Sequence, residues 1–555
     1  MAAMNETAAA TRGRLWLEWL TFAAFCAFLF FFGLGSFGLV GADEPRYAQI
    51  AREMLLRRDW VTPVLHGRPW LEKPALYYWL AIFSYKIFGV SDWAARLPSA
   101  ACATAMVAAI YAFMRRYAPA VAIDAALVTA SSGACVGFAR AASTDMPLAA
   151  TFTIALLAWY CWARGPHPES AEPASAISSH GNSAWLATAY AFLALATLAK
   201  GPVAPALALG IVLLFASARR DLGVVRGTMW VPGILLYVAI TMPWYVAVQH
   251  ATGSFFREFF LEHNLARFTT NVYRHKQPFW YYAPVLLLSL LPWTVFAIAG
   301  FVAAARKRLA GELPLFLMIW GGLPLVFFSI SQSKLPGYIL PAIPAWTLLL
   351  ALLLEDRLAQ QCKPRMMLLV AHAAVAALMV SAVLVLPWVL MHTSSNQVPQ
   401  RVLMIAGGLA ALLFMAIAFS LRRQGFRALR FVTLVPVLVA VGYTLRIDDA
   451  TVDATQSARA VARQIESTVP KSAPVAVFRV RREMEYGLGF YRNAEIPSYD
   501  RGEFPVADHL VVAAAGNKRA LDESAPGKHV SLIGDFPAQR LELYWVSKPL
   551  KLGSK

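Results

Sequence analysis

An uncharged stretch that ends in a cluster of charges decides the fold: residues 19–47 read WLTFAAFCAFLFFFGLGSFGLVGADEPRY. Residues 19–40 are long enough to cross about 30 Å of hydrocarbon as a helix. The run is too long for a removable signal peptide and lacks the small-residue cleavage pattern. Asp43, Glu44 and Arg46 follow at its outer lip. These charges are either those of a solvated loop or part of a reaction site, and the rest of the sequence must decide.

The composition indicates a membrane protein. The chain has 555 residues, of which 58% are hydrophobic and 15% charged, and its mean hydropathy is +0.53. Soluble domains are about a quarter charged. The net charge of +18 arises largely from short connections between apolar runs. This distribution favours an orientation signal over nucleic-acid binding. The five cysteines show no metal-ligand spacing, so we predict no disulfide framework and no structural zinc.

The length rule predicts a polytopic α-helical membrane protein with about thirteen spans. The predicted spans are residues 19–40, 97–114, 120–138, 146–162, 184–199, 202–218, 229–248, 280–305, 313–330, 338–354, 366–391, 402–421 and 429–445.

The connections alternate in character and predict the orientation. The short basic ones belong in the cytoplasm, together with the N-terminus; they are residues 115–117, 218–227, 305–309, 355–365 and 421–430. The Pro/Ser-rich connection 164–183 is also cytoplasmic and is predicted to be disordered. The outer connections are then the long first loop (41–96) and residues 140–147, 199–202, 249–279, 331–338 and 391–401.

The chain divides into a membrane domain, residues 1–446, and a polar tail, residues 447–555, which the odd number of spans places outside. The tail contains one helix-like stretch, DATQSARAVARQIES, and the strand-like stretches APVAVFRV, DHLVVAA and LELYWVSK. We expect a small α/β domain there.

The first outer loop contains two amphipathic segments, residues 43–60 and 72–89, which are candidates for helices lying in the membrane interface. Such helices would hold Asp43, Glu44, Glu72 and Lys73 near headgroup depth. The alternative is that these charged side chains only form the water-facing side of the helices.

Other outer connections present single chemically active residues. Asp145 stands in STDMP (143–147), where it is either an N-cap or a functional acid. Lys200 ends an apolar run in AKGP (199–202) and either snorkels or binds a ligand. The connection EHNLARF (262–268) offers His263, Asn264 and Arg267, and a lone histidine is more often structural. KLPGY (334–338) offers Lys334 and Tyr338 at the start of a span.

The outer face therefore gathers cations near a few carboxylates; the cations are Arg46, Lys73, Lys200, Arg267 and Lys334. Arginine suits a phosphate by its bidentate geometry and lysine as a point charge. The combination suggests a cationic phosphate cradle beside an acidic, sugar-handling centre. Because no soluble nucleotide is expected outside the cell, the phosphate should arrive on a lipid.

Six motifs in this order, DEPRYAQIAREM, EKPALYYW, STDMP, AKGP, EHNLARF and KLPGYILP, resemble those of the bacterial lipid A aminoarabinose transferases. These are C-type membrane glycosyltransferases related to protein O-mannosyltransferases. The resemblance covers the whole chain and implies the C-type fold with a periplasmic C-terminal domain. It also implies transfer of 4-amino-4-deoxy-L-arabinose from undecaprenyl phosphate to lipid A phosphates at the periplasmic face of the inner membrane. This modification lowers the negative charge of the outer surface and gives polymyxin resistance.

The resemblance also implies roles for residues. Asp43 and Glu44 would be the first-loop acidic pair and Asp145 the second-loop acid. The donor phosphate would be bound by Lys73, Arg46, Lys200 and Arg267, and the substrates contacted by Tyr77, His263, Asn264, Lys334 and Tyr338. A lipid A phosphate is already anionic, so the acids would position the acceptor or the sugar ammonium more than remove a proton, and direct attack would invert the sugar carbon. No cofactor or catalytic metal is expected. Some relatives use a divalent metal, and Glu72 with His263 could hold adventitious zinc.

Three rival functions stay open at this stage. The first is another C-type transferase that moves mannose onto protein. The second is a lipid flippase or transporter, although the spans are mostly free of charge and no internal repeat is visible. The third is a catalytically inactive lipid sensor. The sequence alone leaves open which lipid A phosphate is modified, the oligomeric state and the role of the C-terminal domain.

Overall fold

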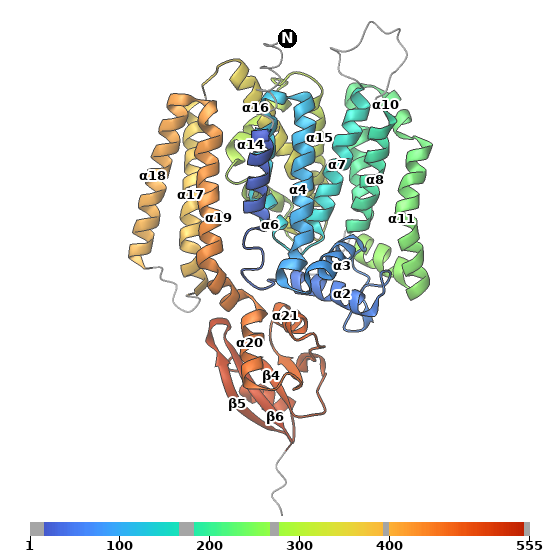
Figure 1. The fold of residues 1–555 in the computed structure, drawn as a ribbon, viewed down its shortest axis with the longest axis vertical. Helices are drawn as coiled ribbons and strands as arrows, with labels where there is room; N and C mark the ends of the chain where they lie inside the picture. The colour runs from blue at the N-terminus through green and yellow to red at the C-terminus, as the bar shows by residue number, and fades with distance from the viewer. Residues whose placement is uncertain (1–15, 166–181, 267–276, 364, 392–398, 549–555) are drawn as a thin grey trace, which may run out of the picture.

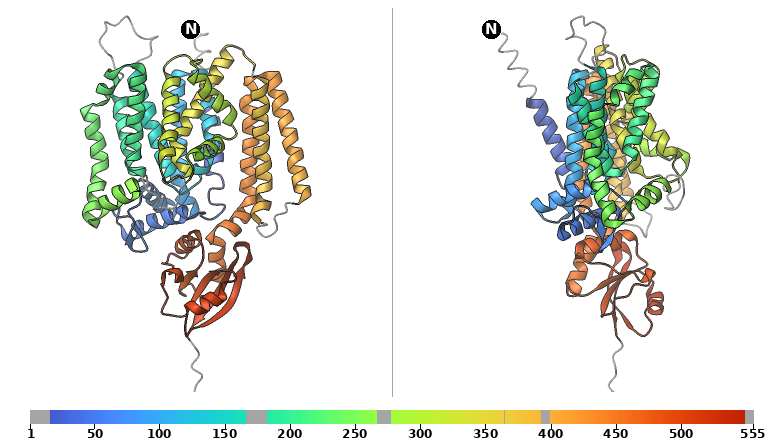
Figure 2. Two further views of the ribbon diagram at one scale, coloured as in Figure 1. Left: turned by 180° about the vertical axis from the view of Figure 1, so that it is seen from behind. Right: turned by 90° about the vertical axis from the view of Figure 1, so that its right-hand side faces the viewer.

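The molecule is a bundle of long helices with a small mixed domain at one end (Figure 1). This computed structural model describes residues 16–165, 182–266, 277–363, 365–391 and 399–548. The described part of the N-terminal segment and the C-terminal domain lie at opposite ends of the bundle in all views (Figures 1 and 2). The predicted disordered connection 164–183 lies almost entirely outside the described residues.

Within the described residues, nine helices are long and apolar enough to cross a membrane. They are α4 (Asp92–Tyr117), α7 (Asp145–Arg164), α8 (Ser183–Lys200), α11 (Val231–Thr252), α15 (Leu313–Ile330), η6 (Pro336–Ala342) continued by α16 (Ile343–Ala359), α17 (Met366–Met391), α18 (Gln400–Gln424) and α19 (Phe426–Gln456). The chain is a multi-pass membrane protein.

Two bent helix pairs bring this number to at most eleven. The first, η2 (Pro119–Val121) with α5 (Ala122–Ala130) and then α6 (Gly133–Ala139), bends by 60°. The second, η5 (Phe279–Tyr281) with α13 (Tyr282–Ser289) and then α14 (Thr294–Ala305), bends by 116°. Two shorter apolar helices span Trp16–Phe31, which ends in η1 (Ala27–Phe31), and α9 (Val203–Arg219). Each of the thirteen predicted spans falls on one of these elements, and the number of spans stays a prediction.

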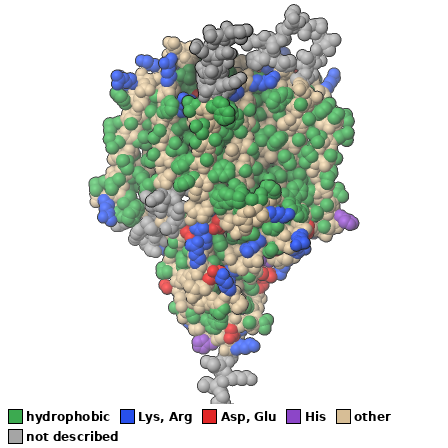
Figure 3. Space-filling model, in the orientation of Figure 1, with side chains coloured by type: hydrophobic (Ala, Val, Ile, Leu, Met, Phe, Trp, Pro, Cys, Tyr) green, Lys and Arg blue, Asp and Glu red, His purple; other side chains and the backbone are tan. Residues whose placement is uncertain are grey.

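The surface of the bundle carries the expected apolar band. In Figure 3 hydrophobic side chains cover the middle of the bundle, whereas Lys and Arg gather at its two ends. Leu235 on α11 and Leu412 and Phe419 on α18 are each more than 60% exposed. Large apolar side chains exposed over such a wide band fit a lipid-facing surface rather than a water-facing one.

The first outer loop folds into a layer across the end of the bundle (Figure 1). It contains α2 (Asp43–Arg57), the short hairpin of β1 (Val64–Leu65) and β2 (Arg68–Pro69), and α3 (Leu76–Phe88). The apolar faces of the two helices share one buried cluster, in which Ile50 of α2 packs with Tyr78 and Ile82 of α3. The predicted amphipathic helices are thus present, and their polar faces are free to carry the charges.

The C-terminal domain is a four-stranded sheet with helices, as predicted. Its elements are α20 (Ala458–Thr468), β3 (Val475–Phe478), α21 (Arg482–Arg492), η7 (Tyr499–Arg501), β4 (His509–Ala514), α22 (Lys518–Ser524), β5 (His529–Phe536), η8 (Pro537–Gln539) and β6 (Leu541–Ser547). The strand order is β3-β4-β6-β5, with β3 and β4 parallel and the other pairs antiparallel. The predicted boundary at 446/447 falls inside α19, which continues to Gln456. The sequence also offered no prediction for β5, in which half of the residues are exposed and only one is buried, so that no clear apolar pattern appears.

A buried ionic network fixes this domain to the first outer segment. Arg459 of α20 donates to Asp92 at 2.9 Å and to Asp453 at 2.9 Å, and also to the carbonyls of Gly35 and Ser36. Tyr491 of α21 donates to the other oxygen of Asp92 at 2.7 Å.

Backbone groups of the first outer segment complete the same network. The amide of Leu39 donates to the Tyr491 hydroxyl at 2.7 Å, and the amide of Gly38 donates to Asp453 at 2.9 Å. Val40 also forms a bridge with Ser457. The segment between the first apolar helix and α2 is thus held by the C-terminal part of the chain.

Candidate functional site

Four charged residues of the first loop form a continuous ion-paired row. Arg46 lies one turn after Asp43 on α2 and donates to it at 2.5 Å. Glu72 lies 3.5 Å from Arg46 and 2.9 Å from the Lys73 ammonium. Asp43 remains 59% exposed, whereas the other three side chains are about nine-tenths buried. The row therefore presents one accessible carboxylate supported by two held cations.

Aromatic rings surround the Arg46 guanidinium. Its Cζ lies 5.1 Å from the ring centre of Tyr47, 5.2 Å from that of Trp70 and 5.8 Å from that of Tyr486. Tyr486 belongs to α21, so the C-terminal domain supplies one wall of this box. Burial lowers the pKa of Arg46, but Tyr47 and the carboxylates of Glu72 and Asp43 raise it above its ordinary value overall. Arg46 is thus a permanent cation with little freedom to move.

Glu44, the neighbour of Asp43, points the other way and is buried. It receives a bidentate pair from Arg96 of α4, at 3.0 and 2.7 Å. Its oxygens also accept the amides of Val40 at 2.8 Å and Ala142 at 2.7 Å. Four donors fill the hydrogen-bonding capacity of a carboxylate. The catalytic role predicted for Glu44 stays a prediction; its contacts are those of a residue that ties the first loop to the second.

A second acid and cation meet at the start of α7. Lys200 forms an ion pair with Asp145, and its ammonium lies 4.9 Å from the centre of the Tyr338 ring. A Cβ at Gly337 would lie 2.6 Å from an oxygen of Asp145, so the chain before Tyr338 must be glycine to approach this closely. Asp145, Lys200 and Tyr338, from three predicted motifs, thus form one cluster.

The side chain of Asp145 does not act as the N-cap of α7. The N-cap of α7 is Thr144, without a side-chain cap, and Asp145 is the first helical residue, where a negative charge also suits the helix dipole. Its carboxylate is engaged by Lys200 instead. Lys200 ends α8 because Gly201 adopts φ +86°, and a Cβ there would lie 2.6 Å from the Phe259 ring. The AKGP turn thereby directs the lysine toward Asp145.

The two clusters lie on neighbouring loops. Ala142, which donates to Glu44, is three residues before Asp145, and Glu44 is adjacent to Asp43. Ser99 of α4 also bonds the carbonyl of Ser143. These ties support a common site for Asp43 and Asp145, whose direct meeting stays a prediction.

The remaining predicted residues are placed as follows. Tyr77 is fully buried, donates to the Ala95 carbonyl and packs its ring against those of Tyr47 and Tyr78; its contact with a substrate stays a prediction. Lys334 is buried and donates to the Ser331 carbonyl, and burial lowers its pKa. The backbone of His263 and Asn264 lies in η4 (Arg257–Ala266). Their side chains, and all of Arg267, lie outside the described residues.

The zinc site predicted from Glu72 and His263 therefore stays a prediction, because the His263 side chain lies outside the described residues. In the part of the chain that the structure describes, no group of three or more His, Cys, Asp or Glu side chains is placed to hold a metal ion.

Sequence reasoning missed Arg96, Trp70 and Tyr486. A signal existed for Arg96, which is an arginine at the start of an otherwise apolar span, and such residues are often functional or paired. Trp70 and Tyr486 give no comparable signal. Tyr486 follows Trp70 by 416 residues and Arg46 by 440 residues, so no local pattern reveals that they lie together.

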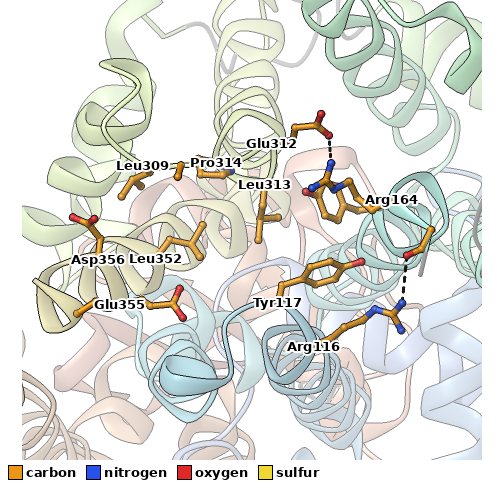
Figure 4. Close-up of a pocket in the computed structure, with 15 residues that line it drawn as sticks. Arg116, Tyr117, Arg164, Leu309, Glu312, Leu313, Pro314, Leu352, Glu355 and Asp356 are labelled. Carbon is orange, nitrogen blue, oxygen red and sulfur yellow. Dashed lines mark hydrogen bonds and ion pairs between the residues drawn. The ribbon is translucent and has the colours of Figure 1, made fainter. Parts of the chain in front are cut away.

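Two of the cavities among the described residues lie in the membrane part and differ in their relation to the predicted site. One, of about 530 Å³, is lined mainly by apolar side chains of α6, α17 and α19 and reaches Glu44 and Arg96. Its apolar walls suit a lipid chain. The other, of about 470 Å³, lies at the end of the bundle opposite the C-terminal domain, where Arg164 of α7 pairs with Glu312 before α15 (Figure 4). It contains none of the predicted site residues.

The chain is similar to known membrane glycosyltransferases. Residues 15–256 match the family model described as dolichyl-phosphate-mannose-protein mannosyltransferase. Two relatives are named undecaprenyl phosphate-alpha-4-amino-4-deoxy-L-arabinose arabinosyl transferase. The one from Pseudomonas fluorescens is 32% identical over 59% of this chain and 54% of its own length. The one from Erwinia tasmaniensis is 28% identical over 85% of this chain and 87% of its own length. The match thus spans only about half of the first relative.

A solved structure shares the whole fold. The crystal structure of ArnT from Cupriavidus metallidurans bound to undecaprenyl phosphate is 23% identical, with a TM-score of 0.77 over 95% of this chain and 97% of that chain. Its apo form gives a TM-score of 0.75 at the same identity. The helical bundle, the layer of first-loop helices and the C-terminal sheet domain thus share the fold of that structure. The chain is therefore similar in sequence to these arabinosyl transferases and in fold to ArnT.

Proposed function

We propose that this protein transfers 4-amino-4-deoxy-L-arabinose from undecaprenyl phosphate to phosphate groups of lipid A. The observation that carries the proposal is that each of two acids forms an ion pair with a cation: Asp43 with Arg46, and Asp145 with Lys200. Lys73 stands in the same row as Arg46. The names of the similar arabinosyl transferases supply the sugar and the lipid carrier.

The donor phosphate binds between held cations. Arg46 is fixed by its aromatic box, and Lys73 and Lys200 carry compact charges next to carboxylates. When a phosphate binds, the ammonium groups of Lys73 and Lys200 replace part of their contact with the carboxylates by contact with the phosphate. The Arg46 guanidinium needs little reorganisation. Fixed positive charges of this kind stabilise the negative charge that grows on a departing phosphate. The apolar cavity beside Glu44 is the place for a lipid chain.

The reaction is a single displacement at the anomeric carbon. A lipid A phosphate oxygen forms the new bond to the carbon as the bond to the undecaprenyl phosphate oxygen breaks, and that phosphate leaves with the electron pair. The configuration inverts. Because a phosphate monoester has its second pKa near 6, the acceptor is anionic at neutral pH and needs no strong base. Asp43, the exposed acid, orients the acceptor or holds the ammonium of the sugar.

The proposed location is the inner membrane, with the site and the C-terminal domain on the periplasmic side. The support is the alternation of basic connections in the sequence. A reporter fused after residue 446 should behave as periplasmic and one inserted at residues 166–181 as cytoplasmic. The opposite pattern would put the site in the wrong compartment. No metal takes part in the proposed reaction, so chelation should leave the transfer rate unchanged.

The decisive experiment is mass spectrometry of lipid A from cells that express the wild type, Asp43→Asn or Asp145→Asn. Asparagine keeps the shape and removes the charge. We expect the aminoarabinose mass increment with the wild type and its loss, with return of polymyxin sensitivity, in both variants. Asp221→Asn is the matched control, because Asp221 caps α10 (Leu222–Thr228) at the other end of the bundle. Wild-type modification by both site variants would refute the assignment.

A second candidate function is glycosyl transfer to a protein. The observation in its favour is the match of residues 15–256 to the protein mannosyltransferase model. A mass increment on a periplasmic protein, with lipid A unchanged, would select this function instead.

A further inference from the structure

A cavity of about 450 Å³ lies between the C-terminal domain and the lip of the first apolar helix. Its walls come from the start of α21, the ends of β3 and β4, the η8–β6 turn, and Gly41 of the first segment. Three of its lining side chains are arginines, namely Arg479, Arg481 and Arg540, and one is an acid, Glu483. The cavity is therefore strongly cationic, and the ion-paired row described above contributes none of its lining.

The backbone at two of these arginines is held in an unusual conformation. Arg479 and Arg540 both have φ +53°, a left-handed conformation that non-glycine residues seldom adopt. The surroundings enforce it: the amide of Arg479 donates to Asp500 at 2.7 Å, and the carbonyl of Arg540 accepts the amide of Ala515 at 2.8 Å. Arg540 is the C-cap of η8, and both arginines are thus presented from a fixed backbone.

Local carboxylates do not neutralise the charges of Arg479 and Arg481. Arg479 donates to the neutral side chain of Asn517 at 3.0 Å. Arg481 is exposed, and neither residue takes part in an ion pair among the described side chains. Helix α21 begins at Arg482, and its N-cap Arg481 provides no side-chain cap, so its first amides add positive potential on the same wall.

The position of the cavity relates it to the reaction. Gly41 is two residues from Asp43, so their Cα atoms are at most about 7 Å apart. On the other wall, Met484 lines the cavity, and Tyr486, two residues later in α21, stacks on Arg46. The cavity and the ion-paired row thus share both the lip of the first loop and helix α21.

We infer that this cavity binds a phosphate of the acceptor glycolipid other than the one that receives the sugar. The inference rests on the proposed function. An acceptor whose headgroup carries two phosphate monoesters offers one to Asp43 and the sugar, while the other enters the arginine-lined cavity. Arginine forks match phosphate oxygens in geometry and charge. The cavity then selects a doubly phosphorylated acceptor and aligns it, which gives the C-terminal domain a direct part in substrate recognition.

The test compares two acceptors and two triple variants of the full-length protein in nanodiscs. The site variant is Arg479→Gln, Arg481→Gln and Arg540→Gln. The matched control removes the same charge from exposed positions of the same domain: Lys471→Gln, Lys518→Gln and Arg519→Gln. Initial rates are measured against bisphosphorylated and monophosphorylated lipid A at saturating donor.

For the wild type and the control variant, we expect a lower KM for the bisphosphorylated acceptor. The site variant should raise that KM about tenfold or more, the size expected when charge-assisted hydrogen bonds to one phosphate are lost. Its KM for the monophosphorylated acceptor, its kcat and its KM for the donor should stay near the wild-type values. Arg481→Gln alone, at an ordinary backbone conformation, should show part of the effect and guards against misfolding of the triple variant.

Three results would overturn the inference: an unchanged KM in the site variant, an equal rise for both acceptors, or an equal rise in the control variant. If the wild type transfers no sugar to either acceptor, the proposed function fails separately. Binding of bisphosphorylated lipid A to the full-length wild type and site variant then decides the inference alone: weaker binding by the site variant supports it, and equal binding refutes it.

Discussion

The buried network around Arg459 predicts that one arginine holds the C-terminal domain in place. Its side chain is 13% exposed, and its two carboxylate partners, Asp92 and Asp453, are 11% and 12% exposed. Arg459→Met would keep much of the apolar stem and leave both carboxylates buried without this partner. Removing one member of a buried ion pair costs about 3–5 kcal/mol. The free energy of opening the contact between α20 and the first segment should fall by this amount.

The assay is native-state hydrogen exchange of the segment that contains the Gly38 and Leu39 amides, which donate into the network. If exchange follows opening, the loss corresponds to exchange that is faster by roughly a hundredfold or more. Arg463→Met is the matched control, because Arg463 lies one turn later on α20, reaches the same Asp453 at 3.8 Å and is 68% exposed. An exposed pair contributes at most about 1 kcal/mol. Equal acceleration by the two variants would refute the reasoning.

Three further predictions test other parts of the structure. Lys73→Ala should abolish transfer and Lys73→Arg should restore little, because a planar fork does not replace a compact charge beside Glu72; full activity of Lys73→Ala in an in vitro transfer assay would remove this residue from the site. Gly201→Ala should destabilise the protein in thermal unfolding by about 1–3 kcal/mol, because of its φ of +86° and the close ring behind it; Gly407→Ala, with open space around its Cβ, should not, and equal shifts would contradict the assignment. Burial lowers the pKa of His509 below 6.5, so the unfolded chain binds a proton that the folded domain does not, and stability should fall as pH decreases below about 6.5; His509→Gln should flatten this dependence in exchange measurements on β4.

The positions of the site motifs could be predicted from the sequence because the membrane imposes strong rules. Apolar runs and basic connections place Asp43, Asp145 and Lys200 at the same end of the bundle, and the structure pairs two of these residues directly. The direction of each side chain could not be predicted. Asp43 and Glu44 are adjacent on α2, yet about 100° of helical rotation sends one toward Arg46 and the other toward Arg96.

Contacts between residues that lie far apart in the sequence could not be predicted either. The box around Arg46 includes Tyr486, and the network around Asp92 includes Arg459. Neither pairing leaves a local pattern, since each depends on how the C-terminal domain packs on the first loop. The domain itself could be predicted from strand periodicity, but its contribution to the site could not.

The stacking of Tyr486 on Arg46 has a consequence for the order of events during synthesis. At about 5–20 residues per second, the residues between these two positions take roughly 20–90 s to translate. The first loop emerges and its segment inserts long before its partners Tyr486, Phe490 and Tyr491 exist. During this interval Arg46 lacks one wall of its box and Arg52 lacks the Phe490 carbonyl. The surroundings of Arg46 and Arg52 are therefore complete only when the last fifth of the polypeptide has been made.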